Sequence, residues 1–305
     1  MQIRSRTRKA SDPVYTRAFR YEPAESLQDA CDALRRNGEG AKVIAGGQSL
    51  LPLINVGLAA PEVVVDISRA PQARDIVLDD GYLSIGALVT HRELAASQTV
   101  RGAQPLLSAA AGHIGNGRVR NRGTLGGSLA HGDPAAELPV VMAALGASYE
   151  LTDGRGTRQL QAEDFAVTVF TTALEADELL VTARVPTLGP GWGWSFLEVS
   201  RRQGDFAIVS AAALVRSAAG TLVESRLALG GVADRPVRLS AVEASMSGAA
   251  CQDIGDRVGQ IEGIRTFGDT SASADYRIHL ARVLAVRALQ QAYRRSEEDK
   301  DGVAS

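Results

Sequence analysis

The sequence has only two cysteines, Cys31 and Cys251, in 305 residues. An iron–sulfur cluster normally takes four thiolate ligands, so this chain cannot build a cluster alone. Cys31 falls on the apolar face of a predicted helix, and free cysteine is among the residue types most often buried. We therefore expect two buried, unreactive thiols and no disulfide.

A pattern of metal ligands is also lacking. The four histidines are scattered without a paired spacing: His91, His113, His131 and His279. His131 can be grouped with Asp133 and Glu137, but the irregular spacing around a single histidine favours a local structural role. We expect no metal site.

An excess of charge of one sign and long apolar runs are missing as well. The 33 basic and 35 acidic side chains nearly cancel, which gives a formal net charge of −2. No global field then gathers nucleic acid or an anionic membrane surface. No stretch approaches the roughly 18 apolar residues of a membrane span, and the basic start leads into Asp12 and Pro13 rather than an export core. We expect a cytoplasmic protein without a nucleic-acid partner or a membrane span.

Hydrophobic periodicity and breaker residues predict several units. Residues 1–15 are aperiodic and polar, as in a flexible arm. Residues of about 16–68 form an α/β unit, in which a helix begins at Ser26 and ends at Gly38, and short β-branched strands follow at 43–44 and 63–65.

A second unit, residues 69–190, begins with a hairpin over 76–85, and Thr90 with Glu93 forms a capping-box pair. Helices are expected at 106–111 and 138–145, strands at 149–151 and 179–185, and irregular, glycine-rich backbone between 112 and 128.

Proline and glycine between Pro186 and Gly193 mark the boundary to a third, α+β unit over residues 191–295. Its pattern predicts strands at 208–215 and 225–229 and helices at 239–246 and 276–293. Residues 296–305 form a polar tail. The chain is therefore expected to be a mixed helix-and-strand protein with a two-part N-terminal domain, 16–190, and a smaller C-terminal domain.

The first distinctive motif, AGGQS over residues 45–49, directly follows a predicted strand. Adjacent glycines let backbone N–H groups turn toward one point, and the Ser49 hydroxyl adds a donor, so the loop suits a phosphate. An ordinary tight turn explains the same residues equally well.

The second motif, RGTLGGSLAH over residues 122–131, repeats the Gly-Gly-x-Ser theme with one residue fewer. Two such loops from neighbouring units can hold the two phosphates of a dinucleotide, with added donors from Thr124 and Ser128. Neither loop has the GxGxxG spacing or the lysine of a P-loop. The recurrence favours dinucleotide binding by a different type of site.

Three arginines alternate in the sequence before the glycine pair of the second motif. Arg118, Arg120 and Arg122 can offset phosphate charge, face a partner, or lie on a solvated strand edge, which is the interpretation that we prefer for Arg120.

The segments AGGQSLLP and RNRGTLGGSLAHGDPAAELP resemble the two FAD-binding motifs of the medium subunits of the molybdenum hydroxylases, the xanthine oxidase and carbon monoxide dehydrogenase family. The likeness continues at RRQGDFA, residues 201–207, and SADYR, residues 273–277. The resemblance implies the FAD-binding domain of the vanillyl-alcohol oxidase (PCMH-type) superfamily, with a small α+β domain of the CO dehydrogenase flavoprotein type after it.

The resemblance also implies which residues contact FAD. Residues of the two loops surround the pyrophosphate and ribityl chain, Glu137 stands where the family commonly has Asp, and Gln48 stands where many relatives have His. Phe196 falls where the family places an aromatic ring against the flavin, although an aromatic side chain in an apolar strand is as often part of the core. For Asp133, a solvated helix N-terminus is an equally good explanation. The implied cofactor-binding residues are Ala45, Gly46, Gly47, Gln48, Ser49, Leu50, Thr124, Leu125, Gly126, Gly127, Ser128, Asp133, Glu137 and Phe196.

By this resemblance the chain is a flavoprotein oxidoreductase that is active only in complex. A large molybdopterin subunit and a small subunit with [2Fe–2S] clusters are the implied partners, in a dimer of heterotrimers, and NAD, oxygen or a quinone is the final acceptor. No catalytic nucleophile with its base is visible in this chain. Two alternatives stay open: a self-contained flavin-dependent oxidase or dehydrogenase, and a phosphate-binding module without a flavin.

Overall fold

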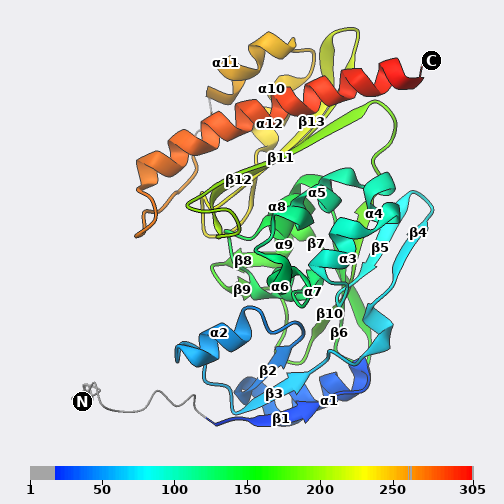
Figure 1. Cartoon of the computed structure of the whole chain (residues 1–305), viewed down its shortest axis with the longest axis vertical. Coiled ribbons are helices and arrows are strands. Elements are labelled where there is room, and N and C mark those ends of the chain that lie inside the picture. The colour runs from blue at the N-terminus through cyan, green and yellow to red at the C-terminus, as the bar shows by residue number, and fades with distance from the viewer. Residues whose placement is uncertain (1–17, 260, 262, 304–305) are drawn as a thin grey trace.

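The computed structural model describes residues 18–303 except residues 260 and 262. The predicted N-terminal arm, residues 1–15, lies outside the described residues. Figure 1 shows three parts stacked along the long axis: a small part drawn in blue, a middle part in cyan and green, and an upper part in yellow to red.

The first part is a three-stranded parallel sheet with strand order β1-β3-β2. Its elements are β1 (Arg20–Pro23), α1 (Leu27–Asn37), the 3-10 turn η1 (Gly38–Gly40), β2 (Ala41–Ile44), α2 (Leu50–Asn55) and β3 (Val63–Asp66). The predicted helix is confirmed, because Ser26 caps α1 by accepting a hydrogen bond from the Asp29 amide and Gly38 ends it. Both thiols are free, Cys31 is buried as predicted, and Cys251 is only half-buried.

The middle part is a five-stranded antiparallel sheet with order β4-β5-β10-β6-β7, covered by short helices. The predicted hairpin and the Thr90–Glu93 capping box are both present. Its strands are β4 (Ile76–Asp79), β5 (Tyr82–Gly86), β6 (Ser148–Thr152), β7 (Thr157–Gln161) and β10 (Leu179–Pro186), with the small hairpin β8 (Ala166–Thr168) and β9 (Thr171–Thr172).

The helices of the middle part fill the segments between these strands. They are η2 (Pro71–Ala73), α3 (His91–Ala96), α4 (Gln98–Ala103), α5 (Pro105–His113), α6 (Gly117–Arg120), α7 (Leu125–His131), α8 (Glu137–Leu145) and α9 (Ala162–Phe165). The expectation of irregular backbone over 112–128 was wrong in part. Thr124 caps α7 by accepting from the Gly127 amide, and helical backbone accommodates both glycines of the motif.

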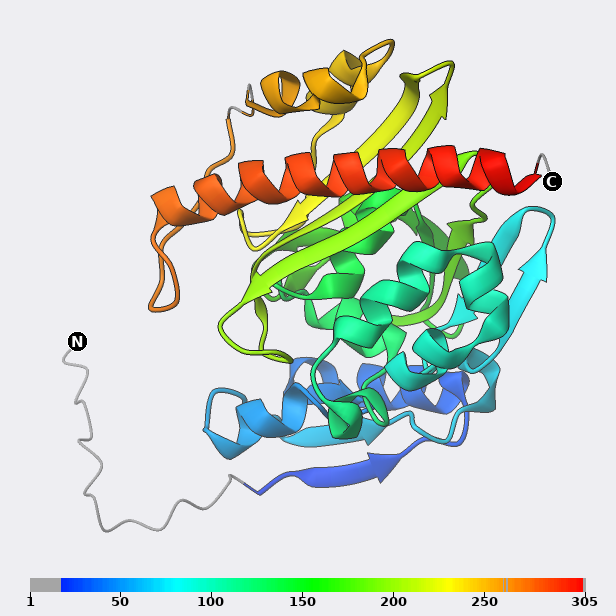
Figure 2. The same ribbon diagram turned by 45° about the horizontal axis from the view of Figure 1, so that its top comes forward.

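The upper part is a four-stranded antiparallel sheet of β11 (Trp192–Ser200), β12 (Ala207–Ala218), β13 (Thr221–Gly230) and β14 (Val237–Arg238). Its helices are α10 (Ser240–Met246), η3 (Cys251–Asp253), α11 (Ile254–Gly259) and α12 (Ala274–Val303). Figure 2 shows α12 lying across the strands, while α8 packs on the opposite face of this sheet. The helix α12 is longer than the predicted 276–293.

The sheet of the upper part separates two hydrophobic cores. Phe196 and Ala212 belong to the core shared with the middle part, whereas Ala211 and Ala213 face the core under α12. Alternate residues of one strand thus fill different cores, which explains why β12 is buried along most of its length.

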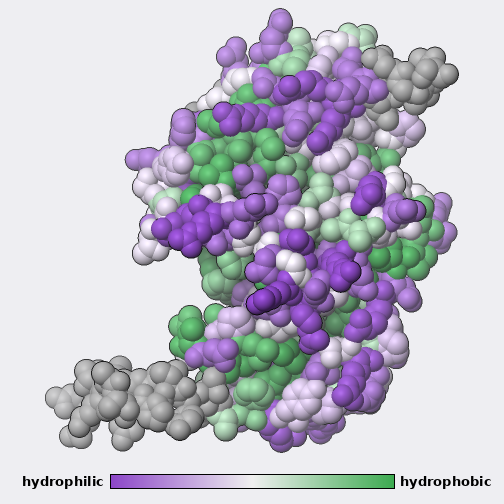
Figure 3. Space-filling model, viewed as in Figure 1, coloured by the Kyte–Doolittle hydropathy of each residue, from purple (hydrophilic) through white to green (hydrophobic). Residues whose placement is uncertain are grey.

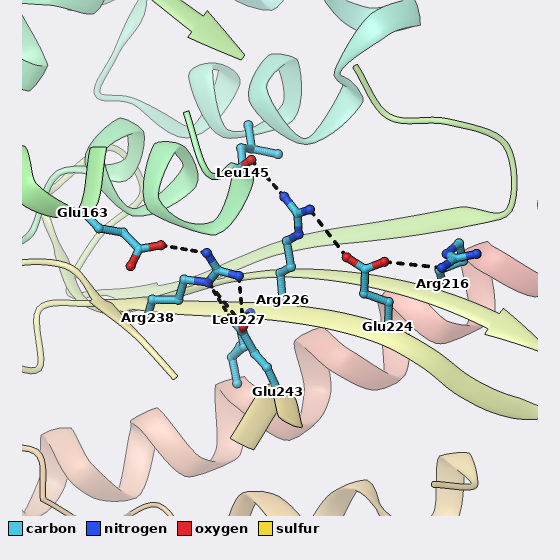
Figure 4. Close-up of polar contacts among 8 residues, drawn as sticks. All are labelled: Leu145, Glu163, Arg216, Glu224, Arg226, Leu227, Arg238 and Glu243. Atoms are coloured by element: carbon cyan, nitrogen blue, oxygen red, sulfur yellow. Dashed lines mark hydrogen bonds and ion pairs between the residues drawn. The ribbon is translucent and has the colours of Figure 1, made fainter. Parts of the chain in front are cut away.

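Polar contacts also join the two domains (Figure 4). The Arg226 guanidinium donates to the Leu145 carbonyl at the end of α8 (3.0 Å), and Arg238 pairs with Glu163 of α9 (2.7 Å). Arg238 also pairs with Glu243 of α10, whose side chain is 9% exposed. These contacts hold β13 and β14 against the middle part.

No helix within the described ranges is both long and apolar enough to cross a membrane.

Candidate functional site

The loop of residues 45–49 follows β2 at the carboxyl end of the parallel sheet, the edge at which α/β sheets bind ligands. Gly47 has a φ of 72°, a conformation that favours glycine. In the described part of the chain, no acceptor receives a hydrogen bond from the amides of Gly46, Gly47, Gln48 or Ser49. Successive amides without protein acceptors are available to bind an anion.

The two glycine motifs, far apart in sequence, touch each other. A Cβ atom on Gly46 would overlap the carbonyl group of Arg122 and crowd the Cα of Gly123. In Figure 1, α6 and α7 lie directly above the end of β2. The structure therefore brings residues 45–49 beside the start of α7, and only glycine at 46 permits the approach.

The second loop differs from the first in that its amides already have acceptors. Leu125 and Gly126 donate to the carbonyl groups of Val89 and Ala87 (2.9 and 2.8 Å), and the Gly127 and Ser128 amides bond to Thr124. Gly126 packs directly on Ala87. This loop thus offers the half-buried Ser128 side chain and a close backbone approach rather than free amides.

A buried histidine supports this second loop. His91 is 5% exposed, its amide donates to the Gly123 carbonyl (3.0 Å), and its ring lies where a Cβ on Gly123 would be. Burial lowers the pKa of His91 to about 4, and the charge of Arg120 adds to this effect. The ring is therefore neutral near pH 7. No motif in the sequence pointed to this role of His91.

A cavity of about 670 Å³ lies beyond the far end of α7, at the junction of the two domains. Its walls come from the loop after α7 (Asp133–Ala135), the β8–β9 hairpin and the segment between β11 and β12. Gly126 and Gly127 lie in the first turn of α7, and the cavity lies past its last residue, so the seven-residue helix spans about 10 Å between them.

Two aromatic side chains at this cavity are unusually accessible. Phe206 is 63% exposed and Phe170, which has a φ of 54°, is 57% exposed. His131 stacks on the Phe170 ring at a centroid distance of 4.9 Å. Neither phenylalanine was singled out from sequence, although Phe206 belongs to the RRQGDFA segment.

A buried arginine shapes the opposite wall of the cavity. Arg277 is 3% exposed, donates to the carbonyl groups of Ile208 and Gly231, and pairs with Asp269 (2.7 Å). The Phe267 ring lies beside its guanidinium. Arg277 is the last residue of the SADYR segment. Its buried contacts give that part of the family resemblance a structural basis.

The remaining residues expected at the cofactor differ in accessibility. Asp133 lines the cavity and accepts a hydrogen bond from the Ala135 amide (2.8 Å). Glu137, the first residue of α8, is 4% exposed, and Phe196 is 5% exposed with its ring against His113. Glu137 and Phe196 thus lie behind the surface of the site.

The strand edge predicted for Arg120 was wrong, because this part of the chain is helical. Arg118 and Arg120 belong to the short helix α6, which Asn116 caps. The Arg120 guanidinium donates to the carbonyl groups of Ile114 and Gly115, whereas Arg118 and Arg122 are exposed.

Apolar side chains gather on the part that carries α2, at the lower left of Figure 3. Leu51, Val56 and Leu58 are 39%, 68% and 79% exposed.

Among the residues described, no three His, Cys, Asp or Glu side chains are grouped to hold a metal ion.

Two family models match the chain in sequence. Residues 17–188 match the FAD binding domain in molybdopterin dehydrogenase, and residues 194–292 match the CO dehydrogenase flavoprotein C-terminal domain.

Individual proteins match over nearly their whole length. The nicotine 6-hydroxylase medium subunit of Paenarthrobacter nicotinovorans is 36% identical over 90% of this chain and 97% of its own. The 6-hydroxypseudooxynicotine dehydrogenase complex subunit alpha of the same organism is 37% identical over 94% and 98%. Among solved structures, a chain of the carbon monoxide dehydrogenase from Hydrogenophaga pseudoflava superposes with a TM-score of 0.87 at 35% identity, over 92% of this chain and 99% of that one.

Proposed function

Because the chain belongs to the FAD-binding medium subunits of the molybdenum hydroxylase family, we propose that it carries electrons from the iron–sulfur clusters of a partner subunit to an external acceptor. It is a flavoprotein oxidoreductase subunit of a multi-subunit complex. FAD supplies the ability to accept electrons singly and to release them as a pair. The residues of this chain bind and orient that cofactor.

The main support for this binding site is that the amides of residues 46–49 donate to no acceptor among the described residues. These amides would hold the FAD pyrophosphate, with hydroxyl donors from Ser49 and Ser128 at the place where the two loops meet. The free amides belong to the first loop, while the second supplies the close wall against which Gly46 packs. The two motifs thus have different tasks.

The cavity beyond α7 is the place that suits the isoalloxazine ring. It lies at the opposite end of α7 from the place where Gly46 meets Arg122, and exposed Phe206 and Phe170 offer apolar faces for a planar ring. The stacking role expected for Phe196 stays a prediction, but its burial favours a place in the core. Asp133 at the cavity wall would accept hydrogen bonds from ribityl or ring groups.

The partners in this proposal are a large molybdopterin subunit, which acts on the substrate, and a small subunit with [2Fe–2S] clusters. Their assembly as a dimer of heterotrimers and the cytoplasmic location stay predictions.

Co-expression with the two partner subunits tests the proposed function. We expect the complex, but not the isolated flavoprotein, to reduce an electron acceptor when substrate is added, with flavin reduction following iron–sulfur reduction in stopped-flow spectra. Substrate turnover by the isolated flavoprotein would contradict the proposal and support a self-contained oxidase.

A further inference from the structure

A buried carboxyl group lies behind the cavity wall. Glu137 is 4% exposed and comes two residues after Ala135, which lines the cavity. A carboxylate without a cation partner is costly at such a depth. No arginine or lysine forms an ion pair with Glu137 among the described residues.

The side chain of Glu137 shares a helix face with Val140, since residues three apart on a helix are neighbours. A Cβ on Gly230 would overlap Val140 and approach the Ser210 hydroxyl (2.6 Å). Ser210 is the direct cross-strand neighbour of Glu198, and such pairs lie on one face of a sheet. Glu137 therefore points from α8 toward the sheet surface that carries Ser210 and Glu198.

Two polar atoms on that surface lack partners. The side chain of Glu198 is 10% exposed, and its Oε2 atom has no hydrogen-bond partner among the described residues, nor has the Oγ of fully buried Ser210. Buried polar atoms without partners are rare in proteins. The other oxygen of Glu198, Oε1, lies 3.5 Å from Nδ1 of His113.

His113 connects this buried group to solvent. It is the last residue of α5, and its side chain is 47% exposed. The contact with Glu198 raises the pKa of His113, with burial opposing and the charge of Glu137 adding to the rise. A half-exposed base thus contacts one oxygen of Glu198, and Glu198 is close enough to Glu137 for its charge to act on the Glu137 carboxyl.

The charges around Glu137 favour its neutral form. Burial raises the pKa of Glu137 to about 7, and the carboxylates of Glu198 and Asp133 act in the same direction. The Glu137 amide and the charge of His113 oppose this rise. A substantial fraction of Glu137 is therefore protonated near neutral pH.

We propose that His113, Glu198 and Glu137 form a proton path from solvent to the cofactor cavity, with Glu137 holding a proton that the flavin takes up when it is reduced. The inference rests on the proposed function. Full reduction of FAD would take two electrons from the partner's iron–sulfur clusters and two protons. Glu137 would supply one proton and would regain it from His113 through Glu198, and His113 would take its own proton from solvent. The second proton would enter from solvent.

Infrared difference spectroscopy of the FAD-loaded protein, reduced minus oxidised, tests the path directly. We expect a C=O band of a protonated carboxyl group that shifts in D₂O and is lost in Glu137→Gln. The matched control is Glu163→Gln, which removes an exposed carboxylate at the same domain junction. A wild-type spectrum without the band, or a band that persists in Glu137→Gln, would overturn the proposal.

A second measurement needs no flavin. The pKa of Glu137 lies above its ordinary value of 4.5 in the folded state, so the folded chain binds more protons between pH 4.5 and about 7. The wild type should lose unfolding free energy through this window as pH rises, and Glu137→Gln should lose less. Equal pH dependence of the two proteins would overturn the role of Glu137 even if FAD binds, whereas a protein that binds no FAD overturns the proposed function.

Discussion

At the scale of single residues, Phe196 and Phe206 have opposite surroundings although ten positions separate them. Phe196 is 5% exposed in the core between the domains, and Phe206 is 63% exposed at the cavity. A ring that stacks on a cofactor needs an accessible face, which Phe206 has. Replacing Phe196 by alanine should therefore affect stability, whereas replacing Phe206 by alanine should affect the bound flavin.

Phe196→Ala should lower the unfolding free energy by about 3–5 kcal/mol, the usual cost of emptying a buried aromatic site. Phe206→Ala should change it by less than about 0.5 kcal/mol, as surface substitutions do, yet alter the absorption and fluorescence of bound FAD. Chemical denaturation and flavin spectra check both. An unchanged flavin spectrum in Phe206→Ala would remove Phe206 from the ring site.

The sequence predicts where the two loops lie in the chain, but not which contacts their residues make. The glycine pairs marked the two loops because glycine permits close approach and positive φ. The sequence could not show that the second loop's amides bond to Val89 and Ala87, since those acceptors are more than 35 positions away. It could not show the burial of Glu137 either, because that depends on a sheet from the other domain.

At the scale of elements, the periodic segments were predictable, whereas the short helices α6 and α7 were not. Helix α1 has a clear apolar face and a serine cap, whereas α6 and α7 are four and seven residues long. Helices of that length gain little from propensity and depend on tertiary packing. Gly126 against Ala87 is such a contact, made with a residue that precedes α3.

The ion pair between Arg238 of β14 and Glu243 of α10 is expected to stabilise the folded protein. Arg238→Ala leaves Glu243, 9% exposed, without its cation, so the unfolding free energy should fall by up to about 3 kcal/mol. Arg216→Ala is the matched control: its pair with Glu224 is exposed on both sides, and such pairs contribute about 0–1 kcal/mol. Figure 4 shows both pairs. Equal losses in thermal or urea unfolding would contradict this assignment.

At the scale of the whole molecule, the junction between the domains is where the proposed functions meet. The FAD-binding domain supplies the amide loop, α7 and Asp133, and the C-terminal domain supplies Phe206, Arg277 and Glu198. The cavity therefore exists only when both domains are present and packed together. In the proposed site, the C-terminal domain completes the flavin pocket.

The central claim is that the free amides of residues 46–49 hold the pyrophosphate of FAD beside Arg122. The most direct measurement is the FAD content of purified protein, from absorbance, for the wild type, Gly46→Ala and the control Gly102→Ala, at which a Cβ meets nothing within 4 Å. We predict stoichiometric FAD in the wild type and the control and its loss in a folded Gly46→Ala protein. A colourless wild type that ignores added FAD, or a Gly46→Ala protein with full FAD content, would contradict the account.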